Sequence, residues 1–150
     1  MLNHQEIKLA MMTVRAETVQ ALERKGYPER VSLLMTDDEI TSQAQMIERL
    51  VKLIVEMEVK FTNLDSAYLT RAVPETEKAK THQQLSEIED TEIEARNRLN
   101  QALDYLLKGT TTEDHRGTIR PWVSLRKTIS AAILTEVERV TEVPTPETIP

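Results

Sequence analysis

The sequence contains no cysteine, and aromatic side chains make up only 3% of its 150 residues. Without cysteine the chain has no disulfide, no thiol nucleophile and no thiolate metal site. The scarcity of aromatic residues predicts a core of Leu, Ile, Val, Met and Ala, which pack well at helical spacing. The lack of cysteine and of a signal-peptide pattern predicts a protein located in the cytoplasm, or within an intracellularly assembled particle, that is not secreted by a signal peptide.

Long apolar runs are also absent. The longest are residues 9–12 and 131–134, about one helical turn each, whereas a membrane-spanning helix needs about 20 apolar residues. We therefore expect no membrane partner. The formal net charge of -6 argues against a broad basic surface of the kind that wraps nucleic acid.

Glycine and proline are few, and they fall outside the segments with periodic hydrophobicity. Because both residues interrupt helices, the stretches without them (29–73, 75–108 and 122–143) are predicted to be helical. Another helix is predicted over 4–25. Asn3 and Glu6 form a capping box at its start, and Gly26 supplies a left-handed residue at its end.

A short helix is predicted over 29–35, and Thr36 with Glu39 caps a long helix that follows. One apolar stripe on the long helix comprises Ile40, Ala44, Ile47, Val51, Ile54, Phe61 and Tyr68. A second stripe comprises Met46, Leu50, Leu53, Met57, Leu64 and Ala67. Two stripes predict neighbours on two sides, with Leu50 and Leu53 at the centre of the fold. A break at Thr62 and Asn63 remains open.

The helix over 75–108 begins with about ten polar residues, which predicts a tip that projects into solvent. The two long helices have roughly 34 residues each, so they reach about 50 Å, more than the roughly 38 Å diameter of a compact globule of this size. The sequence therefore predicts an all-α fold with four main helices. An elongated antiparallel, coiled-coil-like hairpin turns at 72–75, and the helices at either end of the chain flank it.

The fourth helix is expected to start at Pro121, after a loop over 110–120. Residues 1–143 are predicted to form one helical domain. Residues 144–150 include three prolines, which predict an extended C-terminal tail.

A basic segment, residues 115–127, is the main candidate contact site. Its cations surround one aromatic residue: Arg116, Arg120, Trp122, Arg126 and Lys127. Arginine with tryptophan is typical of protein interfaces, and the same residues suit phosphate binding and base stacking. A third interpretation gives the tryptophan to the core and the cations to solvent.

Signals for catalysis are sparse. Glu87 and Asp90 form an E-x-x-D pattern, with which some all-α nucleotide hydrolases hold magnesium, but Glu56 and Glu58 on the facing helix diverge. There is no Glu-x-x-His pair, and His4, His82 and His115 are predicted to be surface residues. No cofactor or metal is expected, and the chain is predicted not to be an enzyme.

These observations favour a non-catalytic structural or assembly protein. It would act through helix packing and self-association, plausibly as a component of a larger homo-oligomeric or virion-like complex, with protein partners that are chiefly copies of itself. The alternatives are a nucleic-acid-associated protein that uses the basic segment, and a magnesium-dependent nucleotide hydrolase.

Overall fold

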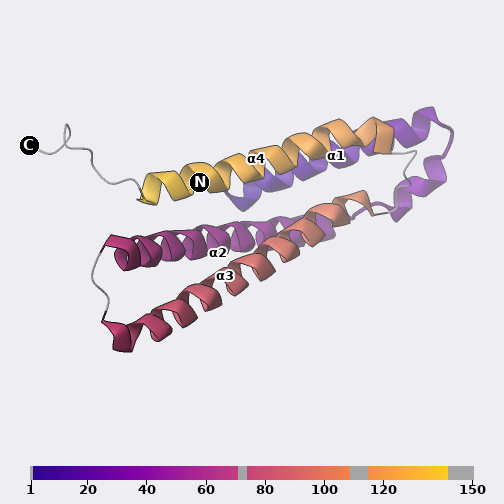
Figure 1. Ribbon diagram of the computed structural model, residues 1–150. Helices are drawn as coiled ribbons and strands as arrows, with labels where there is room; N and C mark the ends of the chain where they lie inside the picture. Colours follow the sequence, from indigo (N-terminus) through magenta and orange to yellow (C-terminus); the bar gives the residue numbers. More distant parts are fainter. Residues whose placement is uncertain (1, 71–73, 109–114, 142–150) are drawn as a thin grey trace, which may run out of the picture.

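The computed structural model describes residues 2–70, 74–108 and 115–141, and every regular element among them is helical. The four main helices are α1 (His4–Arg24), α2 (Asp37–Thr70), α3 (Glu75–Asp104) and α4 (His115–Thr141). Two short 3-10 helices, η1 (Pro28–Leu33) and η2 (Tyr105–Leu107), follow α1 and α3. The all-α architecture with four main helices is therefore confirmed (Figure 1).

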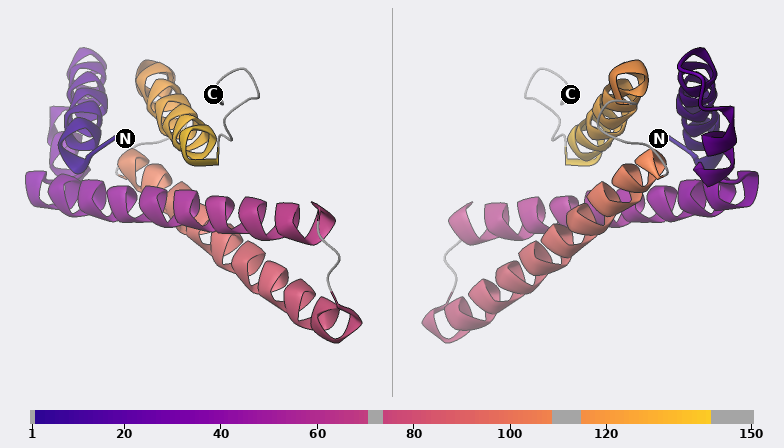
Figure 2. Two further views of the ribbon diagram at one scale, coloured as in Figure 1. Left: turned by 90° about the vertical axis from the view of Figure 1, so that its left-hand side faces the viewer. Right: turned by 90° about the vertical axis from the view of Figure 1, so that its right-hand side faces the viewer.

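The helices form two layers. Helices α2 and α3 make an antiparallel hairpin, while α1 and α4 run antiparallel to each other in a second layer (Figure 1). The views of Figure 2 show that this second layer crosses the hairpin at an angle. Figure 2 shows that this second layer leaves the tip of the hairpin uncovered, and that α2 and α3 diverge toward the tip. The 34 residues of α2 correspond to a length of about 51 Å. The molecule is elongated, as its helix lengths predict.

Local capping explains where the helices begin and end. The Asn3 side chain accepts a hydrogen bond from the Glu6 backbone N–H at 3.0 Å, and the Thr36 hydroxyl accepts one from the Glu39 N–H at 3.1 Å. At the end of α1, Gly26 has a φ of 82°. The N–H of Tyr27 bonds to the carbonyl of Leu22. This geometry is a Schellman motif, so the predicted ends of α1 are confirmed to within one residue.

The first stripe of α2 forms the centre of the core. Ile47, Val51 and Ile54 are fully buried, and their cluster includes residues from all four main helices. On the second stripe Leu50 is buried, whereas Leu53 is only partly buried. The prediction that Leu53 lies at the centre is wrong, because α1 and α4 both pack on the side of the first stripe.

The start of α4 differs from the prediction. The helix begins at His115, so the predicted loop is wrong for residues 115–120, and Pro121 lies inside the helix. Proline removes one backbone donor and costs about 3 kcal/mol in a helix interior. Burial of Leu125, Ile129 and Ile133 provides tertiary packing that outweighs this local preference.

Two further predictions concern the long helices. Helix α2 is continuous through Thr62 and Asn63. Helix α3 ends at Asp104, and its last residues tighten into η2 rather than continuing to residue 108. The expected turn at 72–73 and the extended tail at 144–150 lie outside the described residues.

Within the described part of the chain, no helix combines the length and apolarity that crossing a membrane requires.

Candidate interaction surfaces

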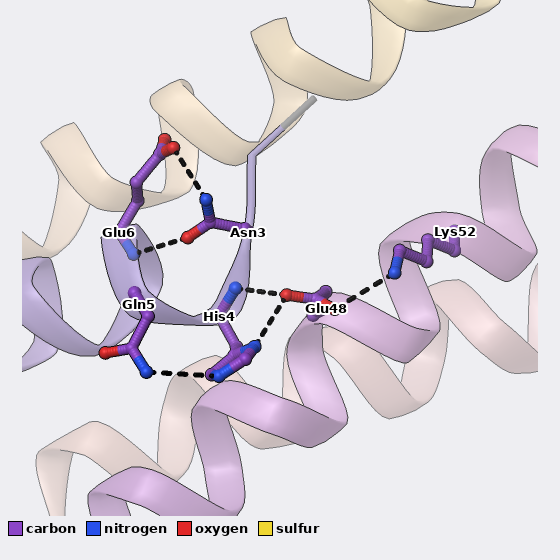
Figure 3. Close-up of polar contacts among 6 residues, drawn as sticks. All are labelled: Asn3, His4, Gln5, Glu6, Glu48 and Lys52. Atoms are coloured by element: carbon purple, nitrogen blue, oxygen red, sulfur yellow. Dashed lines mark hydrogen bonds and ion pairs between the residues drawn. The ribbon is translucent and has the colours of Figure 1, made fainter.

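A polar cluster fixes the start of α1 to α2. The Glu48 carboxylate on α2 accepts a hydrogen bond from the backbone N–H of His4, and it lies 3.0 Å from the His4 Nδ1 atom (Figure 3). Lys52, one turn further along α2, donates to the same carboxylate at 3.0 Å. Glu48 therefore caps a helix to which it does not belong, and it also pairs with Lys52 within α2.

This arrangement perturbs the Glu48 carboxyl group. The hydrogen bond from Lys52, and then the one from the His4 backbone, lower the pKa of Glu48 from 4.5 to about 2. A carboxylate held in this way stays ionised at all physiological pH values. The contact gives His4 a structural partner instead of the plain surface position predicted for it.

A second cluster closes the base of the hairpin. The Tyr105 hydroxyl donates to Glu39 at 2.6 Å, and the Lys108 ammonium group lies 3.0 Å from the same carboxylate. These bonds, the Tyr105 bond first, lower the pKa of Glu39 to about 2. Glu39 thus caps its own helix and also fixes α2 to the end of α3.

The middle of the hairpin contains a layer of charged residues. Glu58 on α2 and Glu92 on α3 both interrupt apolar stripes, and Arg96 pairs with both carboxylates. Burial raises the pKa of Glu92, and a hydrogen bond with Glu58 raises it further. The two glutamates therefore lie at the same level of the hairpin.

Nearer the tip, Tyr68 and His82 join the two helices. The Tyr68 hydroxyl lies 3.1 Å from the His82 Nε2 atom, and the rings meet edge to face with centroids 5.0 Å apart. Most residues between Pro74 and Gln84 are exposed, so the polar tip projects into solvent as predicted.

The basic segment divides into two groups. The Trp122 indole N–H donates to the backbone carbonyl of Leu103 at 2.9 Å, and Arg126 stacks on the Trp122 ring at 4.9 Å. Arg126 also donates to Asn100 at 2.9 Å and lies 3.5 Å from an Asp104 oxygen. Trp122 and Arg126 therefore fasten α4 to the end of α3.

Arg120 and Lys127 form the other group. Both are exposed on α4, where they line a shallow hollow together with Ser124 and Thr128. Arg116 lies within α4, but its side chain and that of His115 are outside the described residues. Among the described side chains, the nucleic-acid hypothesis therefore rests on Arg120 and Lys127 alone.

The magnesium hypothesis gains no support from the fold. Glu87 and Asp90 are exposed, and Glu87 accepts a hydrogen bond from Gln83 at 3.0 Å. Glu58 faces Glu92 and Arg96 instead of the E-x-x-D pair. Across the described ranges, no three His, Asp or Glu side chains are close enough together to hold a metal ion.

Two open hollows lie in line along the hairpin between α2 and α3, and the sequence did not predict them. Together we call them the outer groove. Its base half has a volume of about 630 Å³, and its apolar lining includes Met46, Leu50, Leu53 and Ala102. Its tip half has a volume of about 670 Å³, and its apolar lining includes Met57, Leu64, Ala67 and Ile88. The α2 residues are those of the second stripe, so this stripe faces the groove.

The walls of the outer groove are polar. The base half includes Arg49 and Arg98, and the tip half includes Lys60 and Glu87. The side-chain oxygen of Gln43, also in the base half, is buried and accepts no hydrogen bond from any described residue.

Comparisons with known proteins give no relative. No protein-family model, no curated protein and no solved structure matches this chain.

Proposed function

We propose that the chain is a non-catalytic structural or assembly protein that self-associates by helix packing along the outer groove. It would then be one component of a larger homo-oligomeric complex, such as a virion-like particle. The observation that carries this proposal is the second stripe of α2, an apolar row whose members at Met46, Leu53, Leu64 and Ala67 keep part of their surface in solvent.

The spacing of this stripe supports helix packing. Its members recur at alternating intervals of four and three residues, with Lys60 as the polar exception. This spacing is the heptad pattern by which one helix packs against another. The first stripe of α2 has the same pattern, and its members from Ile40 to Ile54 are buried within the chain. The second stripe is less covered, and a neighbouring helix from a second copy would bury it.

The length of the outer groove suits a partner hairpin. From Gln43 to Ala67 it extends for about 36 Å at 1.5 Å per residue. Two hairpins placed groove to groove would form a four-helix arrangement with the second stripes at its centre.

The test is the mass of the protein in solution. Light scattering coupled to size-exclusion chromatography, and sedimentation equilibrium, should show a dimer or larger species whose population rises with protein concentration. Leu53→Glu should shift this equilibrium toward the monomer, because it places a charge in the groove.

Ile93→Glu is the matched control. Ile93 is also an aliphatic residue of the hairpin, and it is 50% exposed, but it does not line the groove. Circular dichroism should show unchanged helix content in both variants. A wild-type protein that remains monomeric at every concentration would refute the proposal, and equal effects of the two substitutions would refute the role of the groove.

A further inference from the structure

We propose that two copies pair antiparallel about a two-fold axis across the outer groove, so that the base half of one copy faces the tip half of the other. This inference rests on the proposed self-association and specifies its geometry. Its partner is a second copy of this chain, and its support is the distribution of charge and apolar residues along the groove.

The base half of the groove is positive. Arg49 and Arg98 line it, and no described carboxylate does. Arg49 forms no hydrogen bond or ion pair with any residue that the structure describes. Arg98 is 67% exposed, and its ion pair with Glu94 is long, at 3.8 Å. Both guanidinium groups are thus available to a carboxylate from outside the chain.

The tip half carries an uncompensated carboxylate. Lys60 lies 2.9 Å from Glu56, so its charge is already opposed within α2. Glu87 instead accepts a hydrogen bond from Gln83, which is neutral. The Glu87 carboxylate therefore keeps its negative charge at the wall of the groove.

Symmetry allows two ways to place one groove on another. If the two-fold axis runs along the hairpin, the base half of one groove faces the base half of the other, and α2 of one copy lies over α3 of the second. Arg49 would then lie over Arg98 of the other copy, and this like-charge contact would occur twice. If the axis instead runs across the hairpin, the base half of one groove faces the tip half of the other, and each helix lies over the same helix of the second copy. The first arrangement also places Lys60 over Glu87 of the other copy, but Lys60 is already paired with Glu56. The second arrangement brings Arg98 and Glu87 together without placing one arginine over another, so electrostatic complementarity favours it.

The register of the hairpin fixes where this axis passes. Glu58 and Glu92 are in contact, so Met57 lies at nearly the same level as the midpoint between Arg98 and Glu87 on α3. An axis at this level brings Arg98 of one copy over Glu87 of the other. It also brings Leu50 over Leu64 of the other copy, since these residues lie seven positions before and after Met57. One axis therefore satisfies the charged and the apolar pairings together.

A charge exchange tests the geometry by sedimentation equilibrium. Arg98→Glu and Glu87→Arg should each weaken self-association by about tenfold, equivalent to about 1.4 kcal/mol, because each substitution creates two like-charge contacts per dimer. An equimolar mixture of the two variants should associate with near wild-type affinity, since both contacts between unlike variants are then between opposite charges. The double variant, with both substitutions in one chain, should also recover.

Glu89→Arg is the matched control, because Glu89 is exposed on α3 and does not line the groove. It should leave affinity unchanged. If the wild-type protein self-associates but the mixture and the double variant do not recover, the antiparallel geometry is wrong and the proposed function stands. A wild-type monomer overturns both.

Discussion

Neighbouring residues Leu53 and Ile54 give the most direct test of which side of α2 is the core. Ile54 is fully buried. Truncation to Ala removes three carbons worth about 0.8 kcal/mol each, and the cavity adds to this loss, so Ile54→Ala should cost about 3 to 5 kcal/mol. Leu53 keeps part of its surface in water, so Leu53→Ala should cost only about 1 to 2 kcal/mol in the isolated chain.

The assay is urea unfolding followed by circular dichroism, at a protein concentration low enough to keep the chain monomeric. The slope of the free energy with urea should be the same for both variants and the wild type, because truncating one side chain leaves the exposed surface nearly unchanged. Equal losses, or a greater loss for Leu53→Ala, would show that the core has been assigned to the wrong stripe.

The same variants separate folding from association. At high protein concentration, self-association adds to the apparent stability of any chain that still associates. Ile54→Ala should gain this increment in unfolding midpoint as the wild type does, because Ile54 is buried in the core of the chain and does not line the groove. Leu53→Ala should gain less. An identical increment for both variants would contradict a role for Leu53 in the interface.

Three further predictions concern titration and backbone geometry, each measured by unfolding against pH or urea. The pKa of Glu92 is raised in the folded state, so the stability of the wild type falls as pH rises through that pKa. Glu92→Gln should be more stable than the wild type at neutral pH, and the difference should vanish in acid. The pKa of Glu48 is about 2 in the folded state against an ordinary 4.5. The ionised carboxylate therefore stabilises the fold above pH 4.5, and this stabilisation is lost as pH falls toward 2. Glu48→Gln should be less stable than the wild type at neutral pH and should lack this acid dependence. Gly26→Ala should cost about 1 to 2 kcal/mol through its positive φ alone, since no atom lies within 4 Å of the added Cβ, and Gly26→Asn should cost less.

Much of the fold could be predicted from local signals. Asn3, Thr36 and Gly26 have side-chain chemistry and backbone preferences that act within a few residues, and the helices begin and end where these residues predict. The spacing of the first stripe likewise identified Ile47 and Ile54 as helix residues of one face. Such signals need no knowledge of the rest of the chain.

The rest depends on contacts between helices, which a single helix does not specify. Pro121 predicts a helix start locally, but packing of α4 extends the helix beyond it. From the sequence alone, Trp122 and Arg126 were compatible with three interpretations. In the structure both side chains form hydrogen bonds with residues at the end of α3. The outer groove was not predicted, because the spacing of the second stripe indicates a second neighbour without specifying whether it is α1, α4 or another subunit.

Glu58 and Glu92 show how buried charges can determine the register of α2 against α3. Each looks like a defect in its own stripe, and burying either carboxylate alone would be costly. They meet each other and Arg96 in one register only, because sliding α3 by one turn would leave them facing apolar side chains. That register also determines which residues lie symmetrically about Met57. The charged layer therefore stabilises one alignment of the hairpin, and the pairing of Arg98 with Glu87 across two copies depends on that alignment.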